Sequence, residues 1–179
     1  MFRIDLPGHK HTVLYRFTGG TDGAIPETGV ISQGGLLYGA TQHGGGNGCA
    51  DAALAVAAGC GTICALDPAT GTETVLYRFQ GIDDGGLPSF NRLVYLNGLL
   101  YGTTPVGGAR ADDGRSESIG YGTVFSVNAT TGSETVLHRF TRDKNGNNPY
   151  AGLTYMGGAL YGVTSGFSRD HGTIFRIKP

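Results

Sequence analysis

The stretch Thr74–Phe79 reads Thr-Val-Leu-Tyr-Arg-Phe and decides the fold of this chain. The same string fills residues 12–17, and it returns at 135–140 with His138 in place of the tyrosine. The copies begin 62 and then 61 residues apart. A short run of β-branched and aromatic residues predicts a β-strand, and a fixed period of this length indicates a repeat architecture.

Other strings recur in the same order around it. They are Leu-Tyr-Gly at 37–39, 100–102 and 160–162, Gly-Thr-Ile or Gly-Thr-Val at 61–63, 122–124 and 172–174, and a turn of the form Asp/Asn-Gly-x-x-Pro at 22–26, 84–88 and 145–149. In the middle copy, strands are expected near 93–96, 99–103, 122–127 and 134–140. Asn97-Gly98 lies between the first two of these and is typical of a two-residue hairpin. Each period therefore predicts four short antiparallel strands.

Such units, repeated along one chain, predict an all-β, β-propeller-like fold with three four-stranded antiparallel blades. We expect a single repeat domain over 1–179, with units at approximately 1–26, 27–88, 89–149 and 150–179 and the terminal units partial. A β-sandwich gives no reason for the repeat, and a β-solenoid pairs shorter coils in parallel. Three blades are fewer than the four to eight that close a propeller, so we expect either a homodimer with six blades or part of a longer array.

Composition narrows the classes of function. Glycine accounts for 33 of the 179 residues and proline for 7, a content that excludes a long helical architecture. Lys plus Arg number 13 against 14 Asp plus Glu, and no basic stripe is present to bind nucleic acid. No apolar run approaches the roughly 18 residues that a membrane span needs. Residues 1–10 lack the apolar core of a secretory signal peptide. The mature form of a secreted protein, from which the signal peptide has been removed, would look the same.

Taken together, these strings resemble the GloVer-type tandem repeat of bacterial secreted choice-of-anchor proteins. The resemblance covers nearly the whole chain, and it implies an extracellular or cell-surface protein without supplying catalytic residues. It is incomplete in two respects, because no anchor or signal segment is recognised and an extra segment lies between Cys49 and Cys60. The strings that carry it are Glu73–Phe79, Asp84–Pro88, Leu100–Thr104, Gly107-Gly108 and Gly122–Phe125.

Connections in a strand meander alternate between its two ends. The Asp/Asn-Gly-x-x-Pro turns and the segments 41–60, 103–121 and 164–171 therefore share one end, and the other end has only tight turns. From the glycine of Leu-Tyr-Gly to the glycine of Gly-Thr, the three segments measure 22, 20 and 10 residues. Long irregular loops on a rigid scaffold are where binding sites usually lie, so we expect the ligand at this end.

Polar side chains in these turns and loops are the candidate site residues. The expected ligand-binding residues are Asp22, His43, Asp84, Arg115, Glu117, Asp170 and His171. The candidate catalytic residues are Asp84, Asp112 and Asp113. Two carboxyls about 5–10 Å apart could cleave a glycosidic bond, and carboxylate oxygens could also bind calcium. A solvated loop is the simpler interpretation, because the sequence shows neither the spacing of an EF-hand nor a nucleophile elbow.

Residues that recur in every unit allow two interpretations. Arg16, Arg78 and Arg139 each lie six residues before the first residue of a turn. They could form one ligand site per blade, but we favour an arginine that braces its own turn by a charge-assisted hydrogen bond. The tyrosine of each Leu-Tyr-Gly string could stack on a sugar, but an aromatic residue beside a glycine on a central strand favours a core position.

The chain has three cysteines. Cys64 takes the place of a strand phenylalanine, Phe125 in the next unit, which favours a small buried hydrophobic side chain. Cys49 and Cys60 bracket an Ala-rich insert, and we expect them to form a disulfide in an oxidising compartment if the insert loops back. Four ligands with the spacing of a zinc site are absent, so we expect no metal cofactor.

Three functions remain open at this point. We favour a secreted or cell-surface module that binds extracellular carbohydrate at the end where the loops gather. One alternative is a glycan-cleaving hydrolase or lyase that uses loop carboxylates. The other is a structural surface protein that assembles through unpaired terminal strands.

Overall fold

The structure is a computed structural model that describes residues 1–46, 49, 59–88, 92–108, 120–141, 146–166 and 171–179. This described part consists of strands, turns and loops and contains no helix, so the all-β class is confirmed. The strands are β1 (Phe2–Asp5), β2 (Lys10–Val13), β3 (Ile31–Gln33), β4 (Leu36–Thr41), β5 (Thr62–Leu66), β6 (Glu73–Arg78), β7 (Val94–Leu96), β8 (Leu99–Thr104), β9 (Thr123–Asn128), β10 (Glu134–Arg139), β11 (Thr154–Met156), β12 (Ala159–Thr164) and β13 (Thr173–Ile177).

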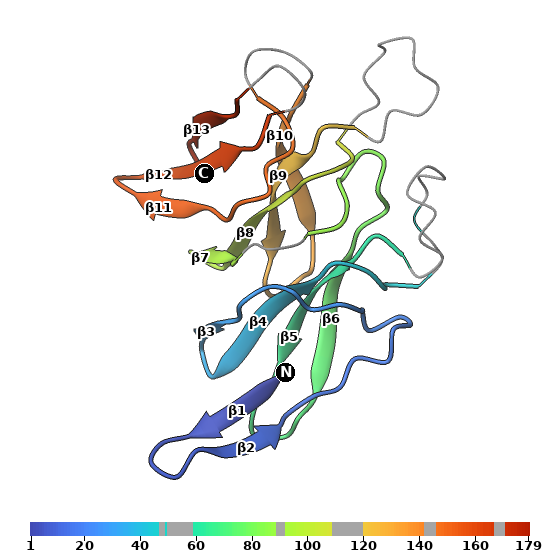
Figure 1. Ribbon diagram of the computed structural model, residues 1–179, viewed down its shortest axis with the longest axis vertical. Coiled ribbons are helices and arrows are strands. Elements are labelled where there is room, and N and C mark those ends of the chain that lie inside the picture. The colour runs from blue at the N-terminus through green and yellow to red at the C-terminus, as the bar shows by residue number, and fades with distance from the viewer. Residues whose placement is uncertain (47–48, 50–58, 89–91, 109–119, 142–145, 167–170) are drawn as a thin grey trace.

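The strands form four antiparallel sheets that follow one another along the molecule (Figure 1). Strands β3 to β6 and β7 to β10 form two four-stranded meanders, as each period predicts. Strands β1 and β2 form a two-stranded sheet, and β11 to β13 form a three-stranded one. The described residues therefore do not form the three complete four-stranded blades that we expected, because β2 pairs with β1 and the outer edge of β13 has no partner strand among them.

The hairpins follow from turn chemistry. Between β7 and β8 the register pairs Leu96 with Leu99, so Asn97 and Gly98 alone make the turn. Their φ angles are 50° and 85°, in the left-handed region that Asn and Gly tolerate best. Tight turns of this kind hold the strands of each sheet close together and place the longer connections elsewhere.

A pair of threonine hydroxyls recurs where the second and third strands of a unit meet. The Oγ1–Oγ1 distances are 2.9, 2.8 and 2.9 Å in the pairs Thr41–Thr62, Thr104–Thr123 and Thr164–Thr173. Each pair lies against the second residue of an Asp/Asn-Gly-x-x-Pro turn, which is Gly23, Gly85 or Gly146. A Cβ at any of these glycines would overlap threonine side-chain atoms, so this close approach of turn and sheet requires glycine.

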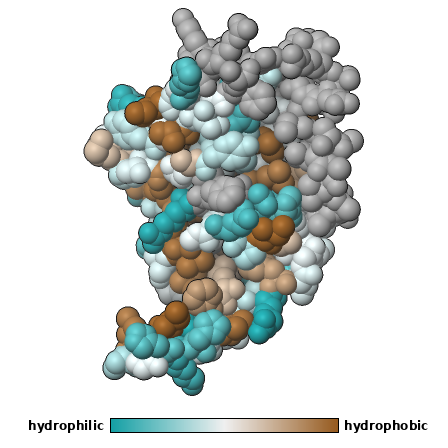
Figure 2. Space-filling model, in the orientation of Figure 1, coloured by the Kyte–Doolittle hydropathy of each residue, from teal (hydrophilic) through white to brown (hydrophobic). Residues whose placement is uncertain are grey.

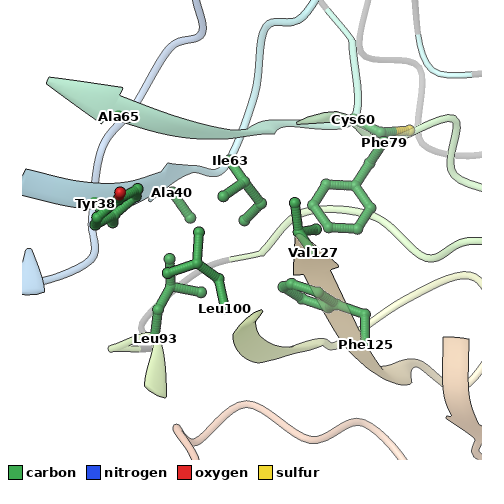
Figure 3. Close-up of a cluster of buried hydrophobic side chains, with 10 residues drawn as sticks. All are labelled: Tyr38, Ala40, Cys60, Ile63, Ala65, Phe79, Leu93, Leu100, Phe125 and Val127. Carbon is green, nitrogen blue, oxygen red and sulfur yellow. The ribbon is translucent and has the colours of Figure 1, made fainter. Parts of the chain in front are cut away.

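Consecutive sheets join through phenylalanine rings. Phe79, just after β6, meets Phe125 on β9 edge to face with ring centroids 5.1 Å apart, and Phe140 and Phe175 repeat this contact. Figure 3 shows Phe79 and Phe125 within the buried cluster that the two four-stranded sheets share. The ring of Phe125 lies over Gly102, its partner in β8, where a Cβ would overlap the ring.

The tyrosines of the Leu-Tyr-Gly strings belong to the core in the two complete sheets. Tyr38 and Tyr101 are 7% and 4% exposed. The equivalent Tyr161, in the three-stranded sheet, is partly exposed. The core interpretation therefore holds for Tyr38 and Tyr101, which offer no open face for a sugar to stack on.

Candidate functional site

The Asp/Asn-Gly-x-x-Pro turns are bound to the segments that follow the second strand of the next unit. Ala24 forms an antiparallel bridge with His43, and Gly86 forms one with Val106. In the third unit, residue 165 donates its backbone N–H to the carbonyl oxygen of residue 148 over 3.2 Å. The expectation that turns and connectors share one end is confirmed for the described residues. We call this surface the loop-rich end, and its described residues are 18–26, 41–46, 80–88, 105–108, 146–150 and 165–166.

Asp84 is the most enclosed carboxylate of this end. Its side chain accepts hydrogen bonds from Tyr77 Oη at 2.7 Å, from the backbone N–H of Gln80 at 2.8 Å and from that of Gly81 at 3.0 Å. The residue is only 8% exposed. Both carboxylate oxygens are thus used to close the turn, which leaves Asp84 poorly placed for the catalytic or ligand-binding role considered from the sequence.

Asp22 repeats this arrangement in the first turn. Its carboxylate accepts hydrogen bonds from Tyr15 Oη at 2.9 Å and from the backbone N–H and hydroxyl of Thr18 at 2.8 and 2.7 Å. Burial acts to raise the pKa of Asp22, but the hydrogen bonds from Thr18 and Tyr15 outweigh it and leave the pKa below its usual value. Burial and the bond to Asp22 raise the pKa of Tyr15 to about 12, so its phenol remains protonated and donates.

The turns are therefore braced by tyrosine, and the expectation that arginine braces them is wrong where the structure describes them. Arg78 lies exposed beside Gly45, and its Nε donates over 3.3 Å to the carbonyl oxygen of Thr21 in the preceding turn. The one ion pair among the described residues lies elsewhere and joins Arg3 to Asp5. The side chain of Arg78 is thus exposed to solvent.

The sequence contained a signal for the tyrosine brace. Tyr15 and Asp22 lie seven residues apart, as do Tyr77 and Asp84. In the third unit both members change together, because His138 replaces the tyrosine and the turn begins with asparagine. Two positions that change together within one chain indicate a contact.

The remaining candidates divide into two groups. His43 is half-buried, its Nδ1 is buried without a hydrogen-bond partner, and it lies at the loop-rich end with Asp22. His171 is exposed just before β13. The candidates that lie outside the described residues are Asp112, Asp113, Arg115, Glu117 and Asp170.

Cys49 and Cys60 form a disulfide, with their Cα atoms 4.8 Å apart. Its sulfur atoms pack against Gly81, and Cys60 also lies against Gly86 in the second turn. The carbonyl oxygen of Cys60 accepts a hydrogen bond from the backbone N–H of Leu87 over 2.8 Å. The disulfide thereby joins the first long connector to the turn between the two complete sheets. The third cysteine is a free, buried thiol on β5.

No three His, Cys, Asp or Glu side chains lie close enough to hold a metal ion among the residues that the structure describes. Asp22 and Asp84 already bind hydrogen-bond donors through their carboxylates. Within the same residues, no helix has the length and apolar character to cross a membrane.

Comparison with known proteins places these features in a family. The model of the Gloeobacter/Verrucomicrobia repeat matches residues 2–179. The chain belongs to this repeat family. The match spans every unit of this Gloeobacter/Verrucomicrobia repeat protein, in keeping with the recurring turns, threonine pairs and phenylalanine contacts. No curated protein matches it.

Solved structures resemble the repeat protein in fold only. A chain from the "Crystal structure of Nidogen/Laminin Complex" is 16% identical with a TM-score of 0.54 over 89% of this chain and 45% of that chain. Less than half of that chain is therefore spanned, and the likeness supports a β-propeller-like arrangement of the sheets. A second match, "Crystal structure of puromycin hydrolase S511A mutant complexed with PGG", is 21% identical over 65% of this chain and 15% of that chain, with a TM-score of 0.40.

Proposed function

We propose that this repeat protein is a secreted or cell-surface binding module that takes extracellular carbohydrate at its loop-rich end. The observation that carries the proposal is the arginine of each repeated hexapeptide. Arg16, Arg78 and Arg139 are all exposed, and Arg78 is held beside two elements of the loop-rich end. An equivalent donor group in successive units provides several similar sites on a rigid scaffold.

The chemistry of this end suits a neutral polyhydroxylated ligand. Thr18, Thr21 and Gln80 expose hydroxyl and amide groups beside the turns. A guanidinium group offers five N–H donors in a fixed plane, which can bind neighbouring sugar hydroxyls. The chain as a whole carries a formal charge of −1, so no strong field favours a highly charged polymer.

The enzyme alternative finds no support in Asp84. A general acid or base must come within hydrogen-bond distance of its substrate. Asp84, the one described member of the expected catalytic set, is buried and binds three donors of its own turn. A binding module needs no such group, and for that reason we favour binding over hydrolysis.

The proposed location outside the cell is supported by the disulfide. Cys49 and Cys60 are bonded, and disulfides persist chiefly in oxidising compartments such as the periplasm and the cell surface. Localisation by fractionation of the native host, with the disulfide state read by thiol labelling, tests this part of the proposal.

A glycan array followed by titration of the best glycan tests the binding proposal. We expect Arg78→Ala to weaken binding about tenfold or more, because a hydrogen bond to a charged donor contributes about 1.5–3 kcal/mol. Arg176→Ala is the matched control, since it removes an exposed arginine from β13, outside the loop-rich end. No binding of any glycan by the native chain, or equal losses in the two variants, would contradict the proposal.

A further inference from the structure

Two glutamates take the same place in consecutive sheets. Glu73 begins β6 and Glu134 begins β10. Oε1 of each is buried and has no hydrogen-bond partner in the part of the chain that the structure describes. On the face of the molecule in Figure 2, by contrast, exposed hydrophobic residues are scattered among hydrophilic ones. The buried glutamates recur at a fixed position and are therefore the more specific feature.

Each glutamate lies beside a fully buried apolar residue. The register pairs Glu73 with Leu66 on β5, and it pairs Glu134 with Val127 on β9. Both partners are 0% exposed. Cross-strand partners project from the same face of a sheet. Each carboxyl group therefore borders an apolar environment, in which an ionised and unpaired form is costly.

The turns that lead into these glutamates pack against the preceding sheet. Gly71, two residues before Glu73, lies against the carbonyl oxygen of Leu14, just after β2. Gly132 lies in the same way against the backbone of Leu76 on β6. We call these the first and second sheet contacts. The first joins the sheet of β1 and β2 to that of β3 to β6, and the second joins the latter to β7 to β10.

At the second sheet contact, the surroundings of Glu134 favour its neutral form. Burial raises the pKa of Glu134 to about 7, the negative charge of Asp84 adds to this effect, and Arg139 on the same strand opposes it. Tyr77 on β6 lies close enough to be affected as well. Burial, the hydrogen bond to Asp84 and the charges of Asp84 and Glu134 raise the pKa of this tyrosine.

The first sheet contact repeats this arrangement. Burial raises the pKa of Glu73 to about 7, with the charge of Asp22 adding to the effect and Arg78 opposing it. Tyr15 and Cys64 on β5 also interact with this glutamate. Burial is the main cause of the raised pKa of each, and Glu73 contributes to both. A glutamate of one sheet is thus set twice against the tyrosine–aspartate brace of the preceding sheet.

We propose that each of the two sheet contacts is a proton-sensitive latch, closed while its glutamate is neutral and loosened when that glutamate ionises. A neutral carboxyl group can remain beside Leu66 or Val127. An ionised one gains by moving into water, away from the negative charge of Asp22 or Asp84. That movement draws the adjoining turn off the preceding strand, so the ligand that closes each latch is a proton.

The sign of the pH dependence follows from proton binding. The closed contact holds its proton up to a pH of about 7, whereas a glutamate released into water loses it near its ordinary pKa of 4.5. The closed state is therefore fully stabilised below pH 4.5, and this stabilisation is lost as the pH rises through about 7. Both contacts should loosen over the same range of pH.

Hydrogen exchange of the full chain at pH 5 and pH 8, corrected for the intrinsic rate at each pH, tests the latch. We expect the protection of peptides over 71–78 and 132–139 to fall about five- to tenfold between these pH values. Glu73→Gln should remove most of this fall in the first peptide alone, and Glu134→Gln in the second alone. Glu27→Gln is the matched control, because it neutralises an exposed carboxyl group outside both turns, and it should change neither peptide.

Titration of the glutamate carboxyl carbons by NMR is a second readout, and it needs no variant to fold. We expect two carboxyl groups of the native chain to titrate near pH 7, each of which one of the glutamine variants removes. Titration of both glutamates below pH 5 overturns the proposal. So does an equal fall in protection for the native chain and the Glu73→Gln/Glu134→Gln double variant. Neither readout involves a glycan, so this inference and the proposed function fail separately.

Discussion

A single carboxylate at position 84 closes the turn between the two complete sheets. It binds one phenol and two backbone N–H groups while being almost fully buried. Asp84→Ala should lower the free energy of unfolding by about 2–4 kcal/mol, because it leaves these donors unsatisfied. Asp84→Asn should cost less, since the amide oxygen can still accept and the third turn naturally begins with asparagine. Urea denaturation measures both, and equal losses would contradict this account of the turn.

Because Gly85 has no Cβ atom, its turn can pack directly against Thr104 and Thr123. Gly85→Ala would place its methyl group on Thr104 and Thr123, at a φ of 96°. Gly98→Ala is the matched control, because its φ of 85° imposes a similar backbone strain and no atom lies within 4 Å. We expect a loss of about 1 kcal/mol for Gly98→Ala from strain alone and a further ~1–3 kcal/mol for Gly85→Ala from overpacking. Thermal or urea unfolding measures the difference, and similar losses would show that the threonine contact is unimportant.

At the scale of the elements, Glu134, the first residue of β10, interacts electrostatically with Asp84 in the turn between the two complete sheets. Burial, assisted by the negative charge of Asp84, raises the pKa of Glu134 from 4.5 to about 7, and its Oε1 is buried without a partner. The folded state thus holds a proton that the unfolded chain releases at lower pH. Stability from this group is complete below pH 4.5 and is lost as the pH rises through about 7.

Glu134→Gln isolates this contribution. The native chain should lose on the order of 1 kcal/mol between pH 5 and pH 8 through this residue, a value reduced for its partial exposure to solvent. The variant should lose less over the same range, and it should be the more stable protein at pH 8. Urea denaturation at several pH values measures both curves. Parallel curves for the two proteins would contradict the assignment.

Much of the element order could be predicted because turn chemistry recurs in the sequence. Asn97-Gly98 and the repeated Gly-Thr strings predict the meanders that are observed. The third sheet could not be predicted, because β1 and β13 share a tripeptide and sequence alone does not say which of them pairs with β2. Competition between two equivalent strands is decided by tertiary contacts.

Geometry explains why the sequence predicts an arginine brace whereas a tyrosine braces the first two turns. Strict alternation would place Val75 and Tyr77 on one face of β6. The register instead shifts between them, so that they pair with the adjacent residues Cys64 and Ile63 and lie on opposite faces. A β-bulge at Leu76 therefore re-aims the tyrosine towards Asp84. Such bulges depend on the packing of the whole sheet and leave little trace in a single sequence.

At the scale of the whole molecule, the Cys49–Cys60 disulfide fastens a long connector to the turn between the complete sheets. Replacing both cysteines by alanine should lower the free energy of unfolding by about 2–3 kcal/mol, because the unfolded chain gains freedom. Denaturation with and without reductant measures the effect. Reductant should destabilise the native chain and leave the double variant unchanged. A similar effect of reductant on both proteins would show that the bond does not stabilise the fold.

The pairing of Gly102 with Phe125 has a consequence for how alike the units are. In the first complete sheet the same two positions hold Gly39 and Cys64. There the Cε atom of Met1 lies 3.4 Å from the position that a Cβ atom on Gly39 would take. Met1 and Gly39 also line a cavity of about 330 Å³. The modules of this chain share a backbone plan without being interchangeable parts. If β9 replaced β5, the ring of Phe125 would lie where the first complete sheet has the thiol of Cys64. The cavity beside Gly39 gives the first module room for that ring.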